Sequence, residues 1–345
     1  MKILLHTRFY PNIGGVETVA SLLVHEWVKL GEEVIVVSDV VCPPDKMRGF
    51  PFKVIYRPSP DQWIKLMRWC DVYLQFMVSL KATWPCLLVR RPLVFTHQSW
   101  YWISREGGCG WRERLKLRLA AGATNIFASQ AIADEMKIPG KVIPNPYDDT
   151  LFRKNGGASR NRALAFVGRL VSDKGVDGLV KALDQLKEHG MHPNLTIIGD
   201  GPERASLEQL VVNLKLKEQV SFAGAQPQDK VAELLQQHEI LIVPSLWPEP
   251  FGVVALEGAA AGCVVLGSNG GGLPGAIGPA GTTFKRGDVN DLVLELSHLL
   301  KHPEESRRYR EAAPAHLELH EPRLIARRYL EVMEDAAKNF KKRQT

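Results

Sequence analysis

The chain has 345 residues, which is long for one hydrophobic core and predicts two domains of ordinary size. Its 44 lysines and arginines exceed its 38 acidic residues, and residues 1–155 alone hold 21 basic and 14 acidic side chains. Five cysteines match neither a disulfide framework nor a zinc site, MKILLH is too short for a signal peptide, and no segment approaches the roughly 20 apolar residues of a membrane span. These features argue against a disulfide-rich secreted protein and predict a cytoplasmic one, at most peripheral at the inner face of the membrane.

Strand and helix patterns alternate through the first half of the chain. A helical stripe of apolar residues covers 16–30 and is ended by Gly31. Short apolar runs predict strands at 2–6, 33–38, 52–56, 71–76, 93–96, 125–128 and 141–143. This alternation predicts a Rossmann-like domain, a parallel sheet with crossover helices.

Two features of this half lie where open α/β sheets place ligands. Gly14 and Gly15 precede the first helix without the G-x-G-x-x-G fingerprint, which disfavours a nicotinamide enzyme but leaves a simple tight turn possible. His97 follows a strand at its carboxyl end, where a histidine can serve a ligand or merely bond to backbone. Three aromatic residues come next, and their faces suit a sugar ring or a lipid headgroup layer; they are Trp100, Tyr101 and Trp102.

Two basic and aromatic segments have two interpretations. WRERLKLRL at 111–119 and WIKLMRW at 63–69 mix Trp and Leu with cations. Such a helix can lie on an anionic membrane or pack on the domain with its cations reaching outward. The alternation of Arg112, Arg114, Lys116 and Arg118 spreads charge around a helix, which weakens the membrane interpretation.

The second half begins after a stretch rich in Pro, Asn, Gly and Ser at 144–162. A buried strand then leads into a loop with Arg169 and Lys174, which can neutralise a diphosphate without a metal. Strands predicted at 195–199 and 220–223 are each followed by a glycine-containing loop, with Gly201 and Gly224. No Asp-x-Asp metal site is present in the sequence.

The most informative stretch is PSLWPEPFGVVALEGAAAG at 244–262, which follows an apolar strand at 240–243. Glu249 lies between two prolines and is expected on an extended loop, and Pro250 is expected to open a helix. Gly252 would let a ligand approach the free N–H groups of that helix, and the Glu257 carboxylate matches the two hydroxyls of a ribose. Together they suit a nucleoside diphosphate, although a buried Ala/Gly-rich helix with two unrelated glutamates is the alternative.

With Glu249 and Glu257 in EPFGVVALE, this stretch resembles the family-four glycosyltransferases, and most of the chain shares the resemblance. The resemblance implies an α/β, GT-B fold, in which two Rossmann-like domains with parallel sheets face each other across a cleft. Residues 1–155 would form the acceptor-side domain, 156–321 the donor-binding domain, and a helix at about 322–345 would pack back on the first. The sequence departs from the pattern at Gly275, where a glutamate is common, and after Asn145, where Pro-Tyr-Asp replaces Gly-Val-Asp.

The resemblance also implies a function and a set of site residues. It implies a retaining, metal-independent transfer of a hexose from a UDP-sugar to a saccharide or lipid-linked glycan acceptor, in cell-surface polysaccharide or glycoconjugate synthesis. No cofactor, metal or nucleic-acid partner is expected, and UDP rests on family frequency alone. The implied catalytic residues are His97, Arg169, Lys174 and Glu249; the implied donor-binding residues are Gly14, Gly15, Gly201, Gly224, Phe251, Gly252, Val253 and Glu257; the implied acceptor-binding residues are Trp100, Tyr101 and Trp102.

Two other functions fit the same architecture. A sugar-nucleotide 2-epimerase would need acid and base carboxylates at the sugar, and Glu249 is the only clear candidate. A non-catalytic subunit that binds a sugar nucleotide or a partner enzyme would need neither.

Overall fold

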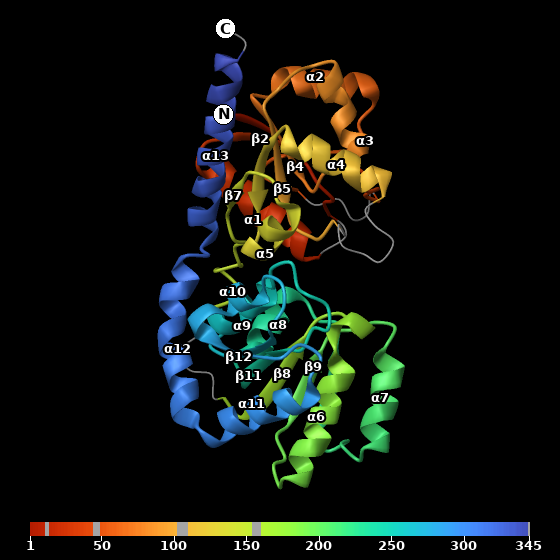
Figure 1. The fold of residues 1–345 in the computed structure, drawn as a ribbon, viewed down its shortest axis with the longest axis vertical. Coiled ribbons are helices and arrows are strands. Elements are labelled where there is room, and N and C mark those ends of the chain that lie inside the picture. Colours follow the sequence, from red (N-terminus) through yellow and green to blue (C-terminus); the bar gives the residue numbers. More distant parts are fainter. Residues whose placement is uncertain (11–13, 44–48, 102–109, 154–159, 344–345) are drawn as a thin grey trace. The chain divides into compact units, whose positions relative to one another are not determined.

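The computed structural model describes residues 1–10, 14–43, 49–101, 110–153 and 160–343, and the chain forms two compact units. The first comprises Met1–Pro146 and His320–Thr345, and the second Tyr147–Leu319 (Figure 1). We predicted a division after residue 155, and the units divide after Pro146. Phe152 is buried and the carbonyl of Arg153 accepts a hydrogen bond from Gln236, so these residues pack with the second unit.

The first unit is built on a seven-stranded parallel sheet. All seven predicted strands are present, because buried parallel strands are continuous apolar runs. Their order across the sheet is β3-β2-β1-β4-β5-β6-β7, and the order reverses between β1 and β4. The strands are β1 (Lys2–His6), β2 (Glu33–Ser38), β3 (Lys53–Tyr56), β4 (Val72–Phe76), β5 (Leu93–His97), β6 (Thr124–Phe127) and β7 (Lys141–Val142).

Helices connect these strands, and a helix from the end of the chain joins them. Trp27 on the first helix is fully buried and donates a hydrogen bond to the carbonyl of Ala326, 3.0 Å away on the last helix. Tyr329 on the last helix bonds through its hydroxyl to Thr96 in β5, at 2.8 Å. The C-terminal helix therefore belongs to the core of the first unit. The helices are α1 (Gly15–Lys29), α2 (Pro60–Trp69), α3 (Leu80–Thr83), the 3₁₀ helix η2 (Trp84–Leu87), α4 (Trp111–Ala121), α5 (Gln130–Met136) and α13 (Pro322–Lys342).

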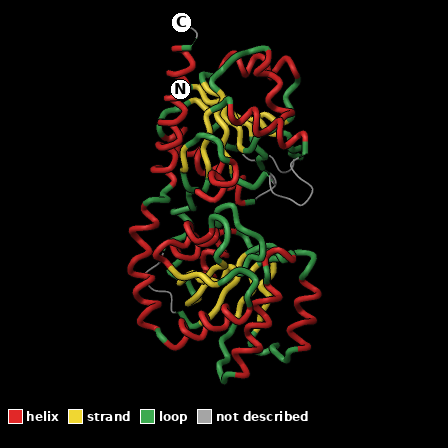
Figure 2. Tube along the Cα trace, in the orientation of Figure 1, coloured by secondary structure: helices red, strands yellow, loops and turns green. Residues whose placement is uncertain are grey.

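The second unit has a six-stranded parallel sheet between helices (Figure 2). Its order is β10-β9-β8-β11-β12-β13, which reverses between β8 and β11. The strands are β8 (Arg162–Val167), β9 (Leu195–Ile198), β10 (Val220–Gly224), β11 (His238–Val243), β12 (Val264–Ser268) and β13 (Gly281–Phe284). The helices are η3 (Ser172–Lys174), α6 (Val176–Glu188), α7 (Arg204–Asn213), α8 (Gln228–Leu235), α9 (Val253–Ala260), α10 (Leu273–Ile277), η4 (Gly278–Ala280), α11 (Val289–Lys301) and α12 (Pro303–Glu318).

The predicted α/β architecture of two Rossmann-like units is confirmed. In each unit the sheet reverses its strand order once, and ligands of open α/β sheets bind outside the carboxyl ends of the strands at such a reversal. Among the described residues, no helix is long and apolar enough to cross a membrane.

Candidate active site

The loops that follow β8 and β11 lie at the strand-order reversal of the second sheet. The backbone N–H groups of Leu246 and Trp247, after β11, donate to the carbonyl of Asp173, after β8, at 2.9 and 3.3 Å. Gly175 ends the first loop with φ +67°, and a Cβ there would lie 2.1 Å from the carbonyl oxygen of Pro244. The two loops are therefore packed backbone to backbone, which fixes the side chains that they carry.

An ion pair joins these loops. The Nζ of Lys174 lies 2.6 Å from Oε1 of Glu249, and the hydroxyl of Ser245 donates to the same oxygen at 2.7 Å. The Glu249 side chain is 14% exposed and that of Lys174 31%, so solvent screens the pair only in part. The structure thus brings together two predicted catalytic residues and adds Ser245, which the sequence analysis did not single out.

The helix that carries Glu257 begins later than we predicted. Pro250 does not open it; α9 begins at Val253, with Gly252 as its N-terminal flanking residue. Glu249 forms a parallel bridge with Gly271, and its carbonyl accepts from the N–H of Gly272 at 2.7 Å, so the chain stays extended there. Gly252 then turns into the helix with φ +104°, a conformation that favours glycine.

Glu257 lies in the middle of α9 and is half-buried. Burial, followed by the negative charge of Asp148, raises the pKa of its carboxyl to about 7. None of the described residues donates a hydrogen bond to this carboxyl in the structure. A carboxylate with unused acceptor oxygens is what recognition of ribose hydroxyls requires.

The remaining predicted residues of this unit lie on neighbouring loops. Arg169 is exposed on the loop after β8, and Phe251 is buried just before α9. Gly201 packs so tightly that a Cβ would lie 2.3 Å from the carbonyl oxygen of Leu170, and Gly224 has φ +71°. These two glycines therefore have backbone reasons to be glycine, whatever ligand they meet.

In the first unit, His97 and Tyr101 form a buried hydrogen-bond network. Asn125 donates its amide to the carbonyls of Ala120, Ala123 and Pro139, so its oxygen faces Nε2 of His97, which must carry the proton. Nδ1 of the neutral ring is then an acceptor, so the Tyr101 hydroxyl donates to it at 2.9 Å and itself accepts from the N–H of Val78 at 2.9 Å.

This network keeps His97 neutral and sets its place in the fold. Desolvation lowers the pKa of His97 to about 4, and its ring is fully buried and stacked on Phe127. His97 is the last residue of β5 rather than the residue after the strand. Contact of His97 or Tyr101 with a substrate stays a prediction; in the structure they fix Val78, in the loop after β4.

The predicted glycine pair of the first unit lies at the start of α1. Gly14 is the extended residue that precedes α1, and Gly15 begins the helix. Trp100 is half-buried, while Trp102 lies outside the described residues.

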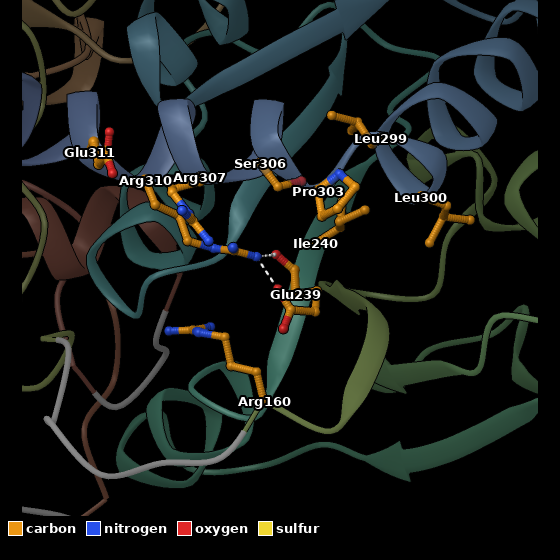
Figure 3. Close-up of a pocket in the computed structure, with 10 residues that line it drawn as sticks. All are labelled: Arg160, Glu239, Ile240, Leu299, Leu300, Pro303, Ser306, Arg307, Arg310 and Glu311. Carbon is orange, nitrogen blue, oxygen red and sulfur yellow. Dashed lines mark hydrogen bonds and ion pairs between the residues drawn. The ribbon is translucent and has the colours of Figure 1, made fainter.

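A cavity of about 760 Å³ lies at the other end of the second unit's strands (Figure 3). Arg160 donates to the carbonyls of His238 and Ala261 at 2.6 and 2.8 Å, and Arg310 pairs with Glu239. These arginines brace the segments that enter β11 and β12. None of the predicted site residues within the described part of the chain lines this cavity, so the loops at the carboxyl ends remain the candidate site.

Comparison with known proteins gives the family. The model of the glycosyl transferases group 1 family matches residues 148–316. The chain is 30% identical to the phosphatidylinositol N-acetylglucosaminyltransferase gpi3 subunit of Schizosaccharomyces pombe over 326 residues, which cover 85% of this chain and 71% of the relative. The chain belongs to the glycosyl transferases group 1 family.

Other relatives extend this comparison. The chain is 30% identical to the MMP alpha-(1->4)-mannosyltransferase of Mycolicibacterium hassiacum over 192 residues. The match covers 55% of this chain and 46% of that protein, so the chain spans about half of that relative's length. The solved structure of Anabaena Alr3699/HepE in complex with UDP superposes with a TM-score of 0.78 at 19% identity, covering 97% of this chain and all of the other. WaaG, a glycosyltransferase involved in lipopolysaccharide biosynthesis, gives 0.71 at 18%, covering 96% and 99%. These neighbours confirm the GT-B fold class.

Two glycines of the second unit form a matched pair for a stability prediction. Gly175→Ala should destabilise by about 1–3 kcal/mol, because alanine at φ +67° is strained and its Cβ meets the Pro244 carbonyl. Gly275 lies in α10 with open space around its Cβ position. Gly275→Ala should therefore be neutral or stabilise by up to about 1 kcal/mol.

Urea unfolding of both variants measures the difference. Equal midpoints for Gly175→Ala and Gly275→Ala would show that the contact between the two loops does not constrain this backbone.

Proposed function

We propose that the chain is a retaining, metal-independent glycosyltransferase that moves a hexose from a UDP-sugar to a saccharide or lipid-linked glycan acceptor. The observation that carries this proposal is the Lys174–Glu249 pair at the strand-order reversal, on the loop that leads to α9 and Glu257. Family membership and the UDP and UDP-glucose named in the HepE structures support it. The pathway that we propose is cell-surface polysaccharide or glycoconjugate synthesis.

The proposed mechanism places stabilising groups where negative charge develops during the reaction. As the bond from the anomeric carbon to the diphosphate breaks, negative charge grows on the leaving phosphate. Arg169, Lys174 and the first N–H groups of α9 would stabilise that charge, and Glu257 would hold the ribose. The acceptor hydroxyl would then attack on the same face and give its proton to the departing diphosphate. Glu249, bound to Lys174 and Ser245, would keep Lys174 in position.

Incubation with a panel of sugar nucleotides, with and without candidate acceptors, tests this reaction. Nucleotide release that requires an acceptor is the expected result. An isomeric sugar nucleotide would instead indicate a 2-epimerase, and binding without turnover would indicate a non-catalytic subunit.

We also propose that α4 contacts an anionic membrane. Trp111 and Leu115 are 70% and 41% exposed, and Arg114 and Arg118 are exposed beside them. Trp111, Leu115 and Arg118 recur at helical spacing and share one face of α4. The alternation in the sequence therefore still places a cation beside the exposed apolar residues. In α2, by contrast, the apolar residues of WIKLMRW are largely buried, which favours a packed helix there.

Arg114→Glu with Arg118→Glu should weaken binding to anionic vesicles by at least about tenfold, since each cation near such a surface contributes roughly 1 kcal/mol. Arg323→Glu with Arg327→Glu, two exposed arginines on α13, changes the net charge equally and serves as control. Co-sedimentation with anionic and neutral liposomes at low salt is the measurement. A wild-type protein that stays in the supernatant would favour a soluble saccharide acceptor.

A further inference from the structure

A cavity of about 1120 Å³ lies within the first unit, at the strand-order reversal of its sheet. The loops after β1, β2, β3 and β4, the first turn of α1 and one side of α4 line it. This is the position at which open α/β sheets bind ligands, and the volume accommodates a molecule larger than one monosaccharide. The lining residues that the structure describes all belong to this unit.

Cationic side chains gather in this cavity. The lining includes two carboxylates, Glu17 and Asp39, and five cations. The cations are Arg8, Arg57, Lys81, Arg112 and Lys116. None of the five forms an ion pair with a residue in the described part of the chain. The guanidinium of Arg112 lies 5.3 Å from the Trp111 ring centre, a contact that leaves its charge unneutralised.

Of the two acids, Asp39 already has a side-chain partner. Oδ2 of Asp39 lies 3.1 Å from Nε2 of His6, a side chain buried at the end of β1. Arg57 donates through Nε to the backbone carbonyl of Asp39 at 3.1 Å, so its two terminal amino groups remain for a ligand. Together with the His6 contact, the nearby charges of Lys81 and Arg57 lower the pKa of Asp39. These two cations therefore lie beside one acid that already has a partner.

The cations of α4 divide between two faces. Arg112 and Lys116, four residues apart, share one side of the helix and line the cavity, whereas Arg114 and Arg118 do not. The alternation in WRERLKLRL thus places cations on two surfaces, the cavity and the outer face with Trp111.

We propose that this cavity binds the acceptor through a phosphate group, held by Arg57 and Lys81 from the strand loops and by Arg112 and Lys116 from α4. Five cations and two acids give the lining a net charge of three positive units, and a ligand with a single carboxylate would neutralise only one of them. A phosphate offers several acceptor oxygens to arginine forks and lysine point charges. The ligand's role as acceptor rests on the proposed function, whereas the binding of a phosphate at this site does not.

Calorimetric titration of the full chain tests the site without turnover. The probes are glycerol 3-phosphate, monomeric dihexanoyl phosphatidic acid, and glycerol as the neutral control. The wild type should bind a phosphate probe and not glycerol. Tighter binding of glycerol 3-phosphate indicates a free phosphate ester as the natural group, and tighter binding of the phosphatidic acid indicates a lipid headgroup.

Arg57→Glu with Lys81→Glu should weaken this binding by at least about tenfold, since charge-assisted hydrogen bonds are lost and repulsion replaces them. Arg323→Glu with Arg327→Glu, equal in net charge and remote in sequence, should bind like the wild type. Lys81→Arg keeps the charge and should also retain binding, and thermal melting checks that each variant folds.

Three results would overturn the site: no phosphate probe binds the wild type, both charge-reversed variants bind alike, or Lys81→Arg loses binding as fully as the double variant. Titration of UDP on the same samples separates this outcome from the proposed function. Absence of UDP binding would refute the donor site and leave the phosphate result standing.

Discussion

Replacing Lys174 by alanine is expected to lower turnover by about 100- to 1,000-fold, the range found when a preorganised electrostatic contact to developing charge is removed. Binding of the free nucleoside should fall far less, because the charge that Lys174 meets is largest in the transition state. Arg169→Ala should follow the same pattern. Steady-state kinetics with UDP-glucose and an active acceptor, together with calorimetry of uridine, measure the two quantities.

Lys181→Ala is the matched control for this prediction. Lys181 lies on α6, seven residues after Lys174, and pairs with Asp177 at the surface. Its removal should leave turnover within about twofold of the wild type, since exposed pairs contribute little. Equal losses of binding and turnover in Lys174→Ala would place Lys174 in ground-state binding and contradict the assigned role.

The second large effect is expected at Glu257. Glu257→Ala should weaken UDP binding by about 10- to 100-fold, because two hydrogen bonds from the ribose to a charged acceptor are lost. 2′-Deoxy-UDP should bind both proteins more nearly alike than UDP does. Unchanged UDP affinity in the alanine variant would show that the ribose assignment is wrong.

The raised pKa of Glu257 adds a pH dependence to this site. The ionised carboxyl is the accepting form, and its pKa is about 7. Its ionised fraction therefore rises as pH increases through 7, and affinity for UDP-glucose should rise by up to about tenfold between pH 6 and pH 8. Glu257→Gln cannot ionise, so its affinity should be flat over this range; a slope equal to that of the wild type would assign the titration to another group.

The fold was largely predictable because buried parallel strands are continuous apolar runs that alternate with helical stripes. The spacing of Glu249 and Glu257 and the position of Lys174 also indicated a donor site. The start of α9 was not predictable from Pro250, since the bridge from Glu249 to Gly271 is a tertiary contact. The same holds for the ion pair of Lys174 with Glu249, which joins residues 75 positions apart.

In the first unit, the sequence did not indicate which cations share a cavity. Arg57 and Lys81 are isolated charges in the sequence and come together only because β3 and β4 end at the same edge of the sheet. His97 and Tyr101 were both candidate site residues, but their hydrogen-bond network depends on Asn125 and Val78, which no local motif connects. Trp27 and Trp63 of this half are buried in its core, so their role is structural.

The most direct test of a nucleoside diphosphate site in the second unit is a thermal-shift measurement with UDP, GDP and ADP on the wild type and Glu257→Ala. UDP at 100 times its dissociation constant should stabilise the wild type by about 2.7 kcal/mol. The variant should lose most of that shift at the same concentration. A shift with GDP alone would contradict the choice of UDP, and no shift with any of the three, or equal shifts in both proteins, would contradict the donor site.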